Sequence, residues 1–149
     1  MKNTLFLFIV ILSACTSAEG AGDVMPCERG ATELAKRLET ANGVGLDLTD
    51  PKTQPAIDAA KAGLEGKRFA FKNCHFDGQG SDTVSFAPTG SSSETISCVM
   101  AGGEAGNKEF RRAAMALDDQ DKMKLDVSGV VKRHEDRLAL TDCKITPHD

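Results

Sequence analysis

The side chains of this chain best suited to chemistry are its five cysteines, and the first of them follows a segment with the features of an export signal. Lys2 supplies a charged start, an unbroken apolar run covers residues 5–12, and two small residues stand directly before Cys15. Together these are the parts of a secretory signal. Eight apolar residues are too few to span a bilayer, so the segment is predicted to be a removed signal and not an anchor. The alternative is a cytosolic protein with a fortuitous apolar start.

The residues Leu12-Ser13-Ala14-Cys15 resemble the lipobox of bacterial lipoproteins. The resemblance implies that Cys15 becomes the mature N-terminus and carries acyl chains that tether the protein to a membrane. Thr16 in place of an aspartate resembles the sorting pattern of outer-membrane lipoproteins in enteric bacteria. We therefore expect a lipoprotein of the cell envelope that is attached through Cys15 to the outer membrane and faces the periplasm, with the inner membrane as the alternative.

Four cysteines remain once Cys15 is assigned to lipid: Cys27, Cys74, Cys98 and Cys143. An even number of cysteines in an exported chain indicates disulfides, here two. The competing interpretation is a metal site, but metal-binding cysteines usually stand two to four residues apart, and here every gap exceeds twenty residues. We therefore predict no metal site and no cofactor.

The other side chains of catalytic or ligand type are scattered. The three histidines fall on a predicted strand, in a turn and in the C-terminal tail: His75, His134 and His148. The acids of residues 118–121 lack the spacing of a calcium loop, and the glycine-rich residues 101–108 lack that of a phosphate loop. No serine lies in a nucleophile elbow, and no cysteine is free once the disulfides form. We predict no catalytic residues.

The charge and aromatic content of the mature chain narrow the classes of partner. Removing residues 1–14 takes away only Lys2, which leaves 17 Lys and Arg against 22 Asp and Glu, a net charge of about −5. Nucleic acids and anionic lipids both favour a basic surface. The chain has no Trp or Tyr, so a surface for aromatic recognition would have to use phenylalanines that the core also needs.

Residues 27–66 have helical spacing. Apolar residues at i, i+3, i+4 and i+7 from Ala31 to Leu38 predict a helix that ends before Gly43. A second helix is predicted from the prolines at positions 51 and 55 to Gly66. Residues 15–26, which precede both helices, have no apolar period and are predicted to be a flexible linker.

From Lys67 onward the apolar residues alternate, which predicts five strands with one helix after the third. Asn107 is the predicted N-cap of that helix. The apolar residues that define the strands are Phe69, Phe71, Cys74 and Phe76; Val84 and Phe86; Ile96, Cys98 and Met100; Met123, Leu125, Val127, Gly129 and Val131; and Leu138, Leu140, Cys143 and Ile145. In the first and last strands the inward phase, which includes Phe76, slips by one residue. This slip predicts β-bulges at residues 72–73 and 141–142, and bulges coil a sheet toward closure.

Three strands, a helix and two strands is the element order of an OB-fold, a five-stranded barrel with its helix between strands three and four. Residues 127–131 and 138–145 resemble the closing hairpin of the tRNA-anti-like OB-fold family, and residues 96–98 resemble its third strand. The expected organisation is a mainly β chain with helices: signal peptide 1–14, linker 15–26, two-helix segment 27–66 and OB-fold domain 67–147.

The cysteine pairing follows from this fold. An OB-fold places its third and fifth strands side by side, which favours Cys98 with Cys143 among the three possible pairings. Cys27 then pairs with Cys74 and joins the helical segment to the first strand.

The first functional interpretation is a non-enzymatic binding or scaffolding module with an envelope protein as partner. The alternatives are a nucleic-acid or oligosaccharide binder and an envelope hydrolase. Clustered Lys and Arg with exposed Phe on the second and third strands would favour the former, and a concave site with paired acids near a histidine would favour the latter.

Overall fold

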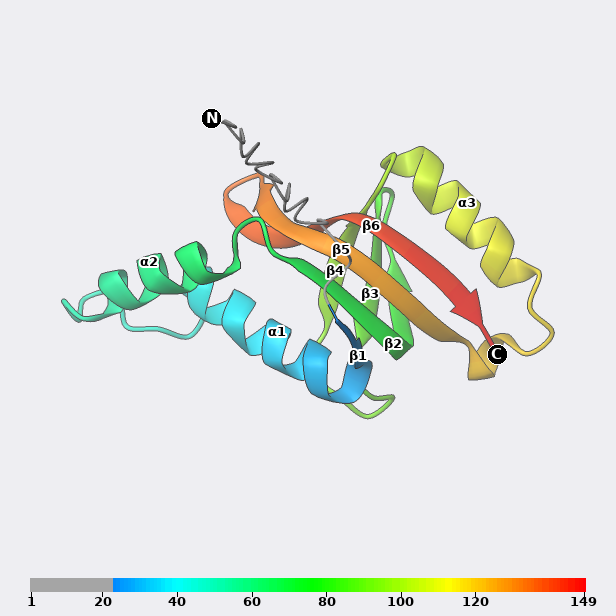
Figure 1. Ribbon diagram of the computed structural model, residues 1–149, viewed down its shortest axis with the longest axis horizontal. Coiled ribbons are helices and arrows are strands. Elements are labelled where there is room, and N and C mark those ends of the chain that lie inside the picture. Colours follow the sequence, from blue (N-terminus) through cyan, green and yellow to red (C-terminus); the bar gives the residue numbers. More distant parts are fainter. Residues whose placement is uncertain (1–22) are drawn as a thin grey trace, which may run out of the picture.

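A computed structural model describes residues 23–149 of the chain, so the predicted signal and Cys15 lie outside the described residues. The described residues form six strands, three α-helices and one short 3-10 turn (Figure 1). In chain order these are β1 (Val24–Pro26), α1 (Cys27–Ala41), α2 (Thr53–Leu64), β2 (Arg68–Gln79), β3 (Thr83–Ala87), β4 (Ile96–Met100), α3 (Glu104–Met115), the 3-10 turn (Gln120–Lys122), β5 (Lys124–His134) and β6 (Arg137–His148).

The five long strands close into a barrel. Their order is β2-β3-β4-β6-β5, and β5 pairs back onto β2. Among the barrel pairs, β4 and β6 run parallel and the others antiparallel. Because α3 lies between the third and fourth barrel strands, the expected OB-fold topology is confirmed.

Both predicted bulges are present. The β2–β5 register shifts between Phe71 and Cys74, and Asn73 within this step has φ 60°. The β5–β6 register shifts opposite Asp142, which has φ 51°. A Cβ added at Gly129, beside the second shift, would lie 2.9 Å from Leu140 Cγ and 3.0 Å from the Cys143 sulfur, so only glycine fits where β5 passes this bulge.

The helices α1 and α3 lie on opposite sides of the barrel strands (Figure 1). Both contribute to one buried cluster, α1 with Leu34 and α3 with Phe110. The helix α2 packs on α1, where Arg37 donates a 3.1 Å hydrogen bond to the Gly63 carbonyl. Leu64 at the end of α2 belongs to the same buried cluster, so both helices of residues 27–66 contribute to the barrel's core.

The two disulfides join the predicted partners. Cys27 is bonded to Cys74 with 5.1 Å between the Cα atoms, which fixes the start of α1 to β2. Cys98 is bonded to Cys143 with 6.0 Å between the Cα atoms, which links the parallel strands β4 and β6. All four side chains are buried. The predicted pairing is confirmed.

Two predictions about local structure are wrong. Val24–Pro26 is not linker but a strand, β1, which pairs in parallel with residues 70–72 of β2. A strand of three residues is too short to show an alternating pattern in the sequence. It is held beside β2 because the next residue, Cys27, is bonded to Cys74 of β2. Phe76 keeps the predicted inward phase, because it is the register partner of the buried Phe86, but it is 39% exposed and its ring lies 6.1 Å from that of Phe110.

The second error concerns Asn107, which is not an N-cap. The cap is Gly103, and Asn107 lies inside α3, 2% exposed. Its side-chain amide donates to the carbonyl oxygens of Gly80, at 2.8 Å, and Thr83, at 3.2 Å, and its Oδ1 accepts from Gln79. A tertiary network, and not the end of the helix, uses this side chain.

Candidate binding grooves

One groove opens where β4 and β6 separate, and we call it the α1 groove. The parallel pairing of these strands begins at Cys98 with Leu140, so the residues before that point leave a gap. The gap holds about 700 Å³ between the end of α1, the β3–β4 loop and the β5–β6 turn. It lies beside β4 and the β5–β6 turn, which belong to the part of an OB-fold that usually binds ligands.

Asn42, the C-cap of α1, fixes one wall of the α1 groove. Its Nδ2 donates to the Leu138 carbonyl at 2.9 Å, and its Oδ1 accepts from the Leu138 amide at 2.8 Å. One side chain therefore satisfies the backbone of β6 where β4 does not reach it. The groove is held between a disulfide-anchored helix and the barrel.

The lining of the α1 groove combines apolar and acidic side chains. Leu38 and the 56% exposed Val44 form an apolar wall. The charged and titratable residues around them are Glu39, Glu94, Glu135, Arg137 and His134. Within residues 23–149, no hydrogen bond or ion pair joins these glutamates to His134 or to Arg137. Three carboxylates against one guanidinium suit a ligand that carries positive charge beside an apolar group.

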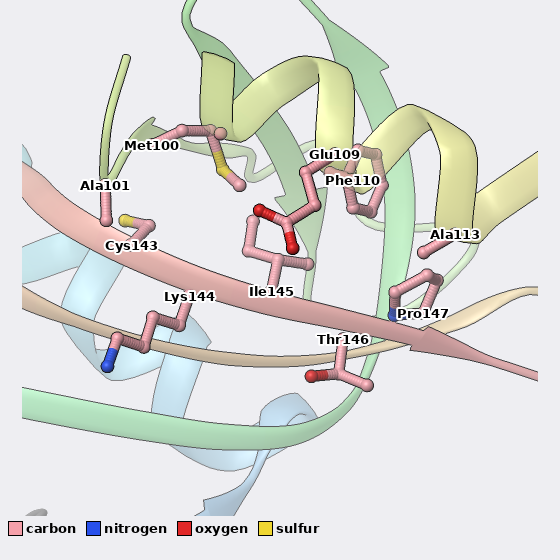
Figure 2. Close-up of a pocket in the computed structure, with 11 residues that line it drawn as sticks. Met100, Ala101, Glu109, Phe110, Ala113, Cys143, Lys144, Ile145, Thr146 and Pro147 are labelled. Atoms are coloured by element: carbon pink, nitrogen blue, oxygen red, sulfur yellow. The ribbon is translucent and has the colours of Figure 1, made fainter. Parts of the chain in front are cut away.

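The second groove lies between α3 and β6, and we call it the α3 groove (Figure 2). It encloses about 450 Å³. Ile145 and Pro147 of β6 point toward α3, whereas Lys144 and Thr146 point away (Figure 2). Glu109 is its one carboxylate. This groove is mainly apolar and offers little with which to recognise a charged ligand.

The outer face of β3 and β4 is polar but neutral. Ser85 and Ser97 lie opposite each other with their hydroxyl oxygens 2.9 Å apart. Phe86 is fully buried, and neither strand contains Lys or Arg. The basic residues of the barrel region lie instead on β2, α3, β5 and β6, with Lys67 just before β2 and Lys122 in the 3-10 turn. The basic and aromatic cluster that would favour nucleic acid is therefore not found in the described barrel.

The histidines lie apart, and no metal-binding group of three ligands occurs in the described part of the chain. Lys124 Nζ lies 2.8 Å from Nε2 of His75 and 3.1 Å from its Nδ1. Partial burial, and then the charge of Lys124, lower the pKa of His75. His148 lies 3.2 Å from the Asp126 carboxylate, and His134 lines the α1 groove.

The glycine-rich residues 101–108 and the acidic residues 118–121 have structural roles. Gly102 and Gly103 have φ of 78° and 60° and form the turn into α3, while Gly106 lies inside the helix. In the predicted acidic turn, Asp119 pairs with Lys122 at 2.8 Å. No helix in residues 23–149 is long and apolar enough to span a membrane.

Comparison of the chain with protein-family models, with curated proteins and with solved structures finds no match in any of the three. Sequence reasoning did not identify the α1 groove, because its walls come from residues about fifty positions apart. The one local signal was Asn42 at the predicted helix end, an asparagine that a cap alone would explain.

Proposed function

We propose that this chain is a lipid-anchored protein of the bacterial cell envelope whose OB-fold barrel is a non-enzymatic binding or scaffolding module. The anchor is Cys15, the membrane is the outer membrane, and the barrel faces the periplasm. The observation that carries the proposal is the pair of buried disulfides, which use the other four cysteines and leave Cys15 for lipid. Disulfides of this kind persist in oxidising compartments such as the periplasm.

The α1 groove supports a binding role. Its walls belong to elements fixed by the Cys27–Cys74 disulfide and by the two Asn42 hydrogen bonds, so the groove is formed before a ligand arrives. Its glutamates are not engaged with the other charged residues of the groove. A preformed groove with free charged groups can bind a partner protein at the membrane surface.

An envelope hydrolase is the second candidate, because the α1 groove gathers glutamates near His134 in a concave site. A general base usually lies within hydrogen-bond reach of its partner groups, and the described glutamates make no such contact with His134. A nucleic-acid or oligosaccharide binder has less support, since the neutral β3–β4 face carries no aromatic platform. Fluorescence anisotropy with single-stranded oligonucleotides near physiological salt should show no sub-micromolar binding.

The anchor is tested by expressing the full chain as Cys15→Ser in a bacterial host and washing the membranes with carbonate. The wild-type chain should stay with the membranes and incorporate a palmitate analogue, whereas Cys15→Ser should do neither, because several acyl chains are needed for durable attachment. Ser17→Ala is the matched control and should behave as wild type. A Cys15→Ser chain that resists the wash would contradict the proposed anchor.

A further inference from the structure

The helix α3 carries a basic and apolar stripe that the barrel does not use. Lys108, Arg111, Arg112 and Met115 stand at i, i+3, i+4 and i+7, so they share one helical face, and all four are exposed. Lys108 pairs with Glu104 of the same helix at 3.1 Å. In the described part of the chain, neither arginine has an ion-pair partner.

The local structure of α3 accounts for only part of this stripe. Cations near the C-terminus of a helix interact favourably with its dipole, which explains Arg112. The dipole does not explain Met115, which ends the helix with 69% of its surface exposed. Methionine is a flexible apolar side chain that adapts well to binding surfaces. The stripe therefore combines two unpaired cations with an apolar contact point.

The α1 groove is complementary to this stripe. It presents three glutamates and one arginine around the apolar wall of Leu38 and Val44. Leu48, in the loop after Val44, is a further apolar side chain with 72% of its surface exposed. Because α1 and α3 lie on opposite sides of the barrel, one molecule cannot bring its own stripe to its own groove (Figure 1).

We propose that the α1 groove of one copy receives the α3 stripe of a second copy, with Met115 against Leu38 and Val44 and with Arg111 and Arg112 facing the glutamates. The proposal rests on the proposed function and names the partner as a second copy of this chain. Such a contact joins different surfaces of the two copies, so it extends into rows or rings. Lipid anchors would confine the copies to one plane and so raise their effective concentration.

The other occupant that the chain itself offers is the segment between Cys15 and the first described residue. Residues 16–22 contain Glu19 and no Lys or Arg. This segment would add negative charge to an acidic groove, so the second copy is the better electrostatic match.

The test uses the full chain in its own membrane with Val44→p-benzoylphenylalanine, which leaves both charged sets intact. Illumination should give an adduct of about twice the chain mass, with the cross-link mapped to the peptide that contains Met115. Arg111→Glu with Arg112→Glu should lower the adduct about tenfold, because close charge pairs across an interface couple strongly. Adding Glu39→Arg and Glu135→Arg to the same chain should restore it. Arg68→Glu with Lys72→Glu, on β2, is the matched control and should leave the adduct unchanged.

Three results would overturn self-association: no adduct, an adduct only with a different protein, or an adduct whose yield is the same in the charge variants as in the wild-type chain. Restoration by the fourfold variant would show that the double variant still folds. Fractionation of the same cells separates this proposal from the previous one. A chain that stays in carbonate-washed membranes but forms no self-adduct would leave the lipid anchor standing, whereas a self-adduct from a chain absent from the membranes would support only self-association.

Discussion

The two ends of the barrel are closed by helices that are attached in different ways. At both ends one asparagine bonds the barrel backbone, Asn42 of α1 to Leu138 and Asn107 of α3 to Gly80 and Thr83. Only α1 also has a covalent link, through Cys27 and Cys74. The helix α3 follows β4 after three residues, whereas α1 precedes the barrel and is separated from β2 by α2 and two connections. A helix outside the barrel topology needs a constraint that chain connectivity supplies to α3.

The largest expected effect is at the α1 end. Replacing Cys27→Ser and Cys74→Ser together should lower the free energy of unfolding by about 4 kcal/mol, because the disulfide closes a loop of 47 residues. Urea denaturation measures this loss. Hydrogen exchange should show α1 amides losing protection before those of β5. Equal protection of α1 and β5 in this variant would contradict the view that the disulfide is what holds the helix.

At the α3 end, Asn107→Ala should cost about 3 kcal/mol, since it removes a side chain that is only 2% exposed and that bonds the carbonyl oxygens of Gly80 and Thr83 and the Gln79 amide. Asn42→Ala is the matched comparison and should cost about 1 kcal/mol, because the Asn42 residue is less buried than Asn107. Thermal and urea denaturation measure both losses. A larger loss for Asn42→Ala would reverse the ranking of the two asparagines.

The order of the strands and their phase were predictable from the sequence, because alternating apolar residues mark each strand and slips in that alternation mark the bulges. The phase slips at residues 72–73 and 141–142 predicted both bulges, and the fold derived from element order then predicted both disulfides. The errors fall where tertiary contacts decide. Asn107 is a residue type typical of an N-cap, but its side-chain amide bonds Gln79 of β2 and the carbonyls of Gly80 and Thr83. The α1 groove likewise depends on a tertiary contact, since it forms where the end of α1 meets β4 and β6.

Substitution of two helical glycines tests how closely α1 packs against the barrel. Gly30→Ala should cost about 2 kcal/mol, because its Cβ would lie 2.8 Å from the Phe71 ring and 3.0 Å from Met25 Cβ. Gly63→Ala, in α2, meets nothing closer than 3.9 Å and should stabilise the chain by about 0.5 kcal/mol through helix propensity. Denaturation midpoints of the two variants give the comparison. A neutral Gly30→Ala would mean that α1 packs less closely than described.

The smallest expected effect lies on the outer face of β2 and β5, away from both helices. Partial burial and Lys124 lower the pKa of His75, so at mildly acidic pH the unfolded chain binds a proton at this position more readily than the folded chain. The contribution of His75 to the free energy of unfolding is therefore fully present above the ordinary histidine pKa of about 6.5. It is lost as the pH falls below that value.

The groups that face this ring decide how large the effect is. Lys124 opposes protonation, and in the strand register it lies between His75 and His148, whose partner is Asp126. His75→Gln should make the decline in urea midpoint between about pH 7.5 and pH 5.5 shallower, and Lys124→Gln should do so to a smaller extent because burial is the larger cause. Lys72→Gln, an exposed lysine on the same strand, should leave the slope unchanged. A steeper decline in His75→Gln would mean that protonated His75 stabilises the fold, opposite to the direction given by its surroundings.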